Sequence, residues 1–167
     1  MAYSTLPKTR RDAVLTLRDG TGSPVTLEIA YEEGNVTFDT PKEAQTVIRD
    51  RGVITTIRKG DSEPAATGSF SAFFRQFTDG AEAGSMLDFI NKTGHYASNV
   101  STGLAGSPFV EFYCIDLAYR VDASSVDAAE TAHQATLSKC VCTASFTEGD
   151  PSSFTINFTC YGGVVYT

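Results

Sequence analysis

The sequence contains no tryptophan, and only four of its 167 residues are cysteine. It has no apolar run near the roughly 18 residues that a membrane-spanning helix needs. Its first residues, Met-Ala-Tyr-Ser-Thr-Leu-Pro-Lys, lack the basic and apolar pattern of a secretory signal. We therefore expect a protein that is made and used in a cytoplasm, without a membrane span. The lack of tryptophan also argues against a carbohydrate-binding β-sandwich, a class that commonly presents exposed tryptophan.

Positive charge is scarce. The chain has 13 Lys or Arg against 20 Asp or Glu, a net charge of −7 and a pI near 4.7. Ordinary nucleic-acid binding needs basic patches for the phosphates, so this balance argues against it. The few cations gather at Lys8–Arg11 and between Arg49 and Lys59. These two groups are either solvated loops or contacts for an acidic surface on a neighbouring copy.

Catalytic motifs are also missing. There is no Gly-x-Ser-x-Gly elbow, phosphate loop or Gly-x-Gly-x-x-Gly. His95 would need a nucleophile and an orienting carboxylate, and nothing marks the nearby Ser98 and Ser101 as activated. Glu28 and Glu111 are a conceivable carboxylate pair for glycoside hydrolysis, but solvated strand faces explain both. We predict a protein that is not an enzyme and has no cofactor.

The cysteines do not form a convincing metal motif. Zinc sites usually place Cys pairs on turns at Cys-x2-Cys spacing, whereas Cys140 and Cys142 are two apart within a strand-like run. A zinc site would need these two with Cys114, Cys160, His95 and His133. Reduced, buried cysteines are the preferred interpretation, and no metal is predicted.

What fills the chain is β-strand and turn sequence. Apolar residues make up 41% and charged residues 20%, which is typical of a globular domain. Val25–Tyr31 and Phe154–Tyr161 alternate between apolar and polar residues, so each has one face on a core. Phe109–Val121 is apolar on both faces, which predicts a central strand. We predict one domain, 1–167, with a mainly β fold: a β-sandwich or partial barrel of about seven to eight strands.

One helix is predicted at 83–92. Met86, Leu87, Phe89 and Ile90 form an apolar stripe at helical spacing, which is typical of a residue set buried in the core. Asp79 or Ser85 is a candidate N-cap, and Gly94 follows the end. This helix is expected to cover an open side of the β-structure.

Two segments look like arms. Residues 1–11 are polar and basic, and are expected to order only against a partner. In the second segment, Pro41–Asp50 is ambiguous between a short helix and an extended arm, and Val53–Lys59 is rich in β-formers. Elsewhere the strand faces are rich in Thr, Ser, Asn and carboxylates. Such a wall repels phosphate and would suit a conduit along which nucleic acid slides.

The order of these segments resembles the major tail tube proteins of long-tailed bacteriophages, which are related in fold to the type VI secretion tube protein. The similarity runs over nearly the whole chain, and no single motif is diagnostic. The segments that carry it are Arg18-Asp19-Gly20, Val25–Tyr31, Arg51-Gly52-Val53 through Arg58-Lys59-Gly60-Asp61-Ser62-Glu63-Pro64, Gly68-Ser69-Phe70-Ser71, the helix at 84–92 and the hairpin through Phe146-Thr147-Glu148-Gly149-Asp150.

This resemblance implies rings of six subunits that close by edge-strand pairing and stack into an open tube. Stacking would use the N-terminal arm and a long arm at 35–62. The implied interface residues are Arg10, Arg11, Arg49, Arg51, Arg58, Lys59 and Asp61. Glu28 is predicted to face the lumen, because it lies on the polar face of the most regular amphipathic strand.

The implied partners are further copies of the chain and the tail terminator, baseplate or tip, and tape-measure proteins. DNA would pass through the lumen without specific binding. The location would be the virion tail, assembled in the host cytoplasm. The alternatives are another structural protein (capsid decoration, tail terminator or the type VI secretion tube protein), a carbohydrate-binding β-sandwich, or an enzyme.

Overall fold

The structure is a computed structural model that describes residues 13–19, 23–29, 36–60, 64–75, 77, 85–97, 113–119 and 133–167. Its body is an eight-stranded antiparallel sheet with the order β2-β1-β7-β8-β9-β6-β3, and β10 also pairs with β8. The strands are β1 (Ala13–Arg18), β2 (Thr26–Ile29), β3 (Thr37–Asp39), β6 (Ala66–Phe73), β7 (Tyr113–Tyr119), β8 (His133–Thr147), β9 (Ser153–Cys160) and β10 (Val164–Tyr166).

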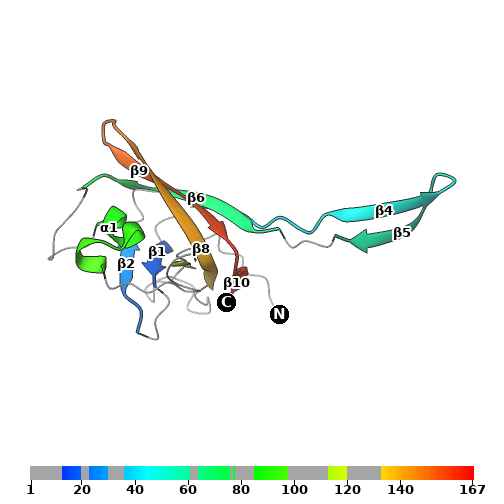
Figure 1. Ribbon diagram of the computed structural model, residues 1–167, viewed down its shortest axis with the longest axis horizontal. Coiled ribbons are helices and arrows are strands. Elements are labelled where there is room, and N and C mark those ends of the chain that lie inside the picture. Colours follow the sequence, from blue (N-terminus) through cyan, green and yellow to red (C-terminus); the bar gives the residue numbers. More distant parts are fainter. Residues whose placement is uncertain are drawn as a thin grey trace, which may run out of the picture.

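A separate two-stranded hairpin, β4 (Gln45–Asp50) and β5 (Val53–Lys59), projects far from this body (Figure 1). The predicted fold class is confirmed: the protein is mainly β, with a curled, partly closed sheet, one flanking helix and a long extended arm. Within the described residues, no helix is long and apolar enough to cross a membrane.

Strict alternation builds the core. In β9, Phe154, Ile156, Phe158 and Cys160 are all buried, as their spacing predicts, while Asn157 is exposed. In β1, Leu15 and Leu17 are buried on the same principle. Because consecutive strand residues point to opposite faces, one side of the sheet faces the core and the other carries mostly polar side chains.

The sheet curls where β8 bends at Lys139. This residue has a φ of 52°, and the β7–β8 register shifts beside it, with Tyr113 opposite Cys140 and Ile115 opposite Leu137. β8 therefore contains one extra residue, a β-bulge, which increases bending and twist. On the other side of β8, β9 ends at Cys160, and the chain then pairs with β8 a second time as β10. This last strand is absent from the sequence prediction, because three residues carry too little pattern.

The helix α1 (Met86–Asn91) is shorter than the predicted 83–92 and begins at the Ser85 cap. The Asp88 backbone N–H donates to Ser85 Oγ at 3.1 Å. Lys92, with a φ of 57°, ends the helix ahead of Gly94. Phe89 is fully buried, and the other apolar stripe residues pack against the same core, so their predicted role is confirmed. α1 contacts β8.

Other boundaries differ from the sequence prediction in instructive ways. The sequence of Ser69–Phe77 predicts one strand, but β6 ends at Phe73, because its partner β9 begins at Ser153, directly opposite Phe73. The ambiguous segment 41–50 contains a strand from Gln45, paired with β5. The 1–11 arm, Asp79 and residues 109–112 and 120–121 of the predicted long strand lie outside the described residues.

Candidate assembly surfaces

The arm, defined as residues 45–59, has an antiparallel ladder but no core. Gln45 lies opposite Lys59 at its base, and Asp50 lies opposite Val53 beside the turn. Arg51 and Gly52 both have positive φ, 49° and 84°, the backbone of a two-residue hairpin turn. All residues of both strands are exposed. An isolated two-stranded hairpin is marginally stable in water, so this element needs a surface to pack on.

The two faces of the arm differ. Val47 and Arg49 share a face of β4, and their cross-strand partners Ile57 and Ile54 lie on the same side, because a register shift between Ile48 and Arg49 adds one residue to β5 there. We call this side the basic face: Gln45, Val47, Arg49, Ile54, Ile57 and Lys59. The opposite face holds Thr46, Ile48, Asp50, Val53, Thr56 and Arg58 and includes the one acidic residue of the arm. The exposed fractions are 48% for Ile54 and 43% for Ile48, so aliphatic side chains reach solvent on both faces.

Four of the predicted interface residues gather on this arm: Arg49, Arg51, Arg58 and Lys59. Lys59 Nζ lies 3.9 Å from Glu43 Oε2, a solvent-exposed pair that contributes little to stability. In the part of the chain that the structure describes, Arg49, Arg51 and Arg58 form no ion pair. The other predicted interface residues, Arg10, Arg11 and Asp61, lie outside the described residues.

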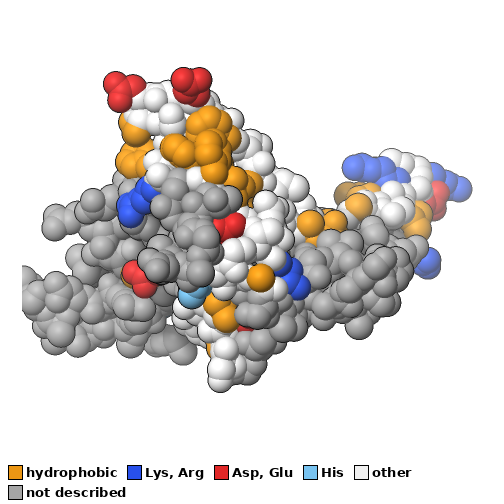
Figure 2. Space-filling model, turned by 60° about the vertical axis from the view of Figure 1, so that its left-hand side comes forward, with side chains coloured by type: hydrophobic (Ala, Val, Ile, Leu, Met, Phe, Trp, Pro, Cys, Tyr) orange, Lys and Arg blue, Asp and Glu red, His pale blue; other side chains and the backbone are white. Residues whose placement is uncertain are grey.

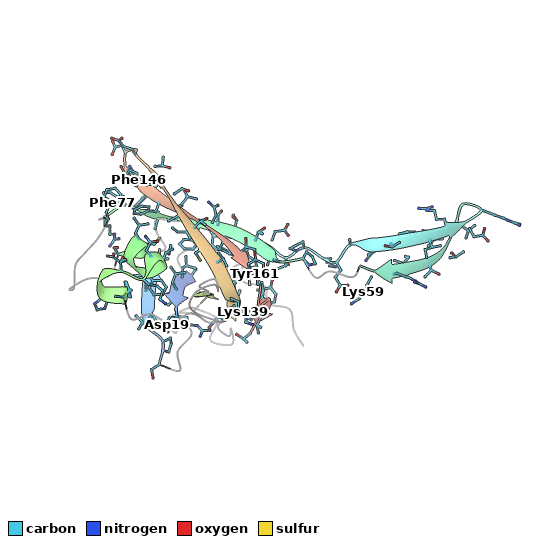
Figure 3. The ribbon with its side chains drawn as sticks, in the orientation of Figure 1. Asp19, Lys59, Phe77, Lys139, Phe146 and Tyr161 are labelled. Atoms are coloured by element: carbon cyan, nitrogen blue, oxygen red, sulfur yellow. The ribbon has the colours of Figure 1, made fainter. Side chains whose placement is uncertain are left out.

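At the far end of the body, four aromatic rings pack together, and two of them, Phe77 and Phe146, are labelled in Figure 3. We call Phe74, Phe77, Phe146 and Phe154 the phenylalanine cluster; the ring centroids of Phe74 and Phe77 are 4.6 Å apart, and those of Phe77 and Phe146 are 5.2 Å apart. Phe154 is buried, whereas 51% of Phe77 and 44% of Phe146 are exposed. The cluster therefore joins the core on one side and meets solvent on the other.

The turn between β8 and β9 stands beside this cluster and carries Glu148 and Asp150, both exposed. We call residues 148–152 the acidic turn. Figure 2 shows acidic side chains above an apolar patch at this end of the body, and basic side chains around apolar ones on the arm. Sequence reasoning missed this surface. Its signal in the sequence is Phe73-Phe74-x-x-Phe77, a pattern that equally predicts the continuation of a strand.

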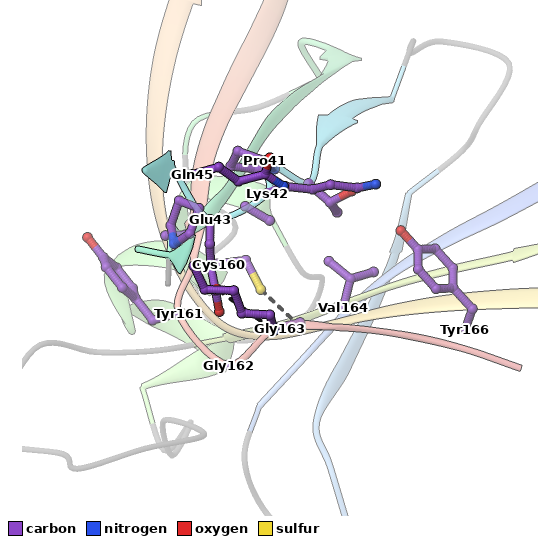
Figure 4. A pocket seen from close by; sticks show the side chains of 15 residues that line it. Pro41, Lys42, Glu43, Gln45, Cys160, Tyr161, Gly162, Gly163, Val164 and Tyr166 are labelled. Carbon is purple, nitrogen blue, oxygen red and sulfur yellow. Dashed lines mark hydrogen bonds and ion pairs between the residues drawn. The ribbon is translucent and has the colours of Figure 1, made fainter. Parts of the chain in front are cut away.

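A groove of about 580 Å³ lies at the base of the arm, between residues 40–45 and the outer side of β10 (Figure 4). Pro41, Val164 and Tyr166 line it, and 62% of Tyr166 is exposed. Cys160 Sγ donates a hydrogen bond to the Gly163 carbonyl at 3.2 Å and so ties the turn before β10 to the end of β9. The groove adjoins a strand edge that has no partner among the described residues.

The outward face of β3, β6, β9 and the second half of β8 is a wall of hydroxyl and amide groups. One cross-strand row runs Thr37–Ser69–Asn157–Thr143. Thr37 Oγ1 lies 3.2 Å from Ser69 Oγ, and Thr143 Oγ1 donates to the Asn157 carbonyl at 3.4 Å. A second row runs Asp39–Thr67–Thr159–Val141, and a third runs Ser71–Thr155–Ser145. We call this surface the hydroxyl face.

Glu28 is exposed on β2, at the opposite edge of the same sheet. It lies opposite Thr16, in a register row that continues to Asp116 and Thr136. Its strand neighbour Ile29 is buried, so Glu28 points away from the core. The structure thus places Glu28 on the outward side of the sheet, and its predicted lumen position stays a prediction.

The residues weighed for chemistry are dispersed. His95 and His133 are exposed, and Ser98, Ser101 and Glu111 lie outside the described residues. Cys140 and Cys160 are buried free thiols, and burial raises the pKa of the Cys142 thiol to about 12. Among the described residues, no three His, Cys, Asp or Glu side chains converge as metal ligands.

No protein-family model and no curated protein matches the chain. Solved structures do match its fold. The PVC sheath/tube terminator of an extracellular contractile injection system, in the extended state, has a TM-score of 0.61 at 12% identity, over 99% of both chains. A chain of the six-fold symmetrised baseplate of the anti-feeding prophage has a TM-score of 0.51 at 6% identity, over 100% of this chain and 97% of that one. At such identities the likeness is one of fold, over the full length.

Proposed function

We propose that the protein is a structural subunit of a phage-tail-like assembly, in which rings of six copies stack into a tube that conducts a genome. The observation that carries this proposal is the arm: an exposed hairpin with aliphatic residues on both faces, which needs a neighbouring subunit to cover it. The full-length fold likeness to components of two injection systems supports the same role, and the six-fold symmetry of the anti-feeding prophage baseplate supports the ring size.

The sheet edges support ring closure. Within the described residues, the strand order begins at β2 and ends at β3, and each has an outer edge without a strand partner. Unpaired edges invite association, and pairing β2 of one copy with an edge of the next copy would continue the sheet around a ring. We infer that this pairing builds the ring, while the arm reaches beyond it.

The hydroxyl face and Glu28 support a lumen that conducts nucleic acid without holding it. The rows through Ser69 and Asn157 offer no cation to phosphate, and Glu28 would repel it. We propose that this outward side of the sheet lines the channel. The role is then structural and not catalytic, and the protein belongs to the assembled particle, beside terminator, baseplate and tape-measure proteins.

A second candidate is the terminator itself. The PVC protein that matches the fold over its whole length is described as a sheath/tube terminator, and the match is stronger than that to the baseplate chain. A tube protein adds rings without limit, whereas a terminator forms one ring and stops growth. The two roles therefore differ in what the pure protein builds.

The test is negative-stain electron microscopy together with sedimentation velocity at rising protein concentration. The proposal expects stacked rings or tubes with an axial channel, and single rings that do not stack would favour the terminator. A species that stays monomeric at every concentration, with and without preformed tube ends as an initiator, would overturn both.

A further inference from the structure

We propose that the arm of one copy docks, through its basic face, on the phenylalanine cluster and acidic turn of a second copy. The inference rests on the proposed function, because it names the surface that receives the arm within the same assembly.

The two surfaces match in their apolar centres. Val47, Ile54 and Ile57 form the middle of the basic face and are 43–58% exposed. On the other surface, Phe77 and Phe146 expose about half of their side chains, while Phe154 anchors the cluster to the core. Large exposed apolar groups that lie together mark interaction sites. Aliphatic side chains against aromatic rings would remove both patches from water.

The charges around these centres are opposite. Arg49 lies on the basic face, and Arg51 stands at the tip of the arm. Glu148 and Asp150 are the only charged residues between positions 143 and 160. The opposite face carries one cation, Arg58, and one anion, Asp50, so its net charge is zero and these carboxylates would repel Asp50. Charge therefore selects the basic face for this contact.

The placement of the two surfaces selects a second copy as the partner. The arm and the acidic turn lie at opposite ends of the molecule (Figure 1), so the arm of a copy is remote from its own cluster. Every copy carries both surfaces and can donate its arm in one direction while it receives an arm from the other. Such a head-to-tail contact is heterologous and repeats along a ring or a stack.

A charge swap tests this contact. Two variants are purified, Arg49→Glu/Arg51→Glu on the arm and Glu148→Lys/Asp150→Lys on the turn. Each alone places like charges together and is expected to raise the concentration needed for assembly at least about tenfold. Mixed one to one, the reversed arm meets the reversed turn, and each unchanged arm meets an unchanged turn. The mixture is expected to assemble within about threefold of the wild-type concentration, which also shows that both variants are folded.

The control is Lys92→Glu/Lys139→Glu, which changes the net charge of the body by the same amount as the arm variant changes that of the arm, and should leave assembly unchanged. If the wild type assembles but each swap variant also assembles normally, or the mixture stays unassembled, the arm docks elsewhere, on another surface or another protein. If the wild type itself never assembles, the proposed function fails instead.

A second pair of variants tests which face docks. Ile54 and Ile48 are the same residue type with similar exposure, 48% and 43%, on opposite faces of the arm. Ile54→Ala should raise the assembly concentration about tenfold, whereas Ile48→Ala should change it less than about threefold. Equal effects of the two substitutions would overturn the choice of the basic face.

Discussion

The arm and the body are built from the same kind of antiparallel ladder, yet they use their apolar residues differently. In β9, buried Ile156 and Phe158 alternate with polar residues that face outward. In the arm, Val47 and Ile48 are neighbours, as are Val53 and Ile54, so both faces carry aliphatic groups. A one-sided pattern suits a sheet that covers its own core, whereas a two-sided pattern suits a strand pair that other elements enclose. Among the described residues, no surface encloses the arm, and every residue of its two strands is exposed.

The largest difference between the two regions should appear in the free energy of unfolding. Ile156→Ala removes fully buried methyl and methylene groups and should destabilise the protein by about 2–5 kcal/mol. Ile54→Ala on the exposed arm should change the free energy of unfolding by less than about 0.5 kcal/mol. Chemical denaturation below the assembly concentration measures both. Similar losses in the two variants would mean that the arm belongs to the cooperative fold of the monomer.

A second comparison concerns the two faces of β6. A Cβ added to Gly68 would clash with the Thr37 carbonyl oxygen and with the Phe158 ring, because the ring fills the space that a side chain would need. Gly68→Val should therefore destabilise the body by about 1–3 kcal/mol or more through overpacking.

The matched control for Gly68→Val is Ser69→Val, one residue along, on the hydroxyl face. The substituted side chain there has room to extend outward, and the expected change is within about 0.5 kcal/mol. Equal losses at the two positions, measured by denaturant titration, would contradict the assignment of the core face.

The smallest expected effect is a pH dependence in the body. Burial raises the pKa of Cys142 to about 12 from an ordinary value of 9.0, because the neutral thiol is favoured in the folded state. Its contribution to stability is fully present below pH 9 and is lost as the pH rises toward 12. Cys142→Ala should lose stability less steeply between pH 9 and 10.5 than the wild type does. If the free energy of unfolding falls equally with pH in the two proteins, the pKa of Cys142 does not differ between the folded and the unfolded state.

Much of the body could be predicted from the sequence, because burial imposes a period that can be read along the chain. The alternation in 154–160 predicted four buried residues, and the stripe in 86–90 predicted the core face of the helix. The long arm and its four cations also followed from composition and from the family resemblance. Segment 41–50 stayed ambiguous, because a strand with two apolar faces has no period of two.

The receiving surface could not be predicted, because it is assembled from residues far apart in the chain. Phe74 and Phe77 follow β6, whereas Phe146 and Phe154 flank the acidic turn about 70 residues later. Only the pairing of β6 with β9 brings them together. The predicted lumen position of Glu28 depends on how copies are arranged, so the chain alone does not decide it.

The central claim is that the arm gains its stability from a neighbouring copy. Amide hydrogen exchange, followed peptide by peptide in the dispersed and the assembled protein, tests it most directly. The account predicts that residues 45–59 exchange rapidly in the dispersed protein and become strongly protected on assembly, while β8 and β9 stay protected in both states. Equal protection of residues 45–59 in the two states would contradict it.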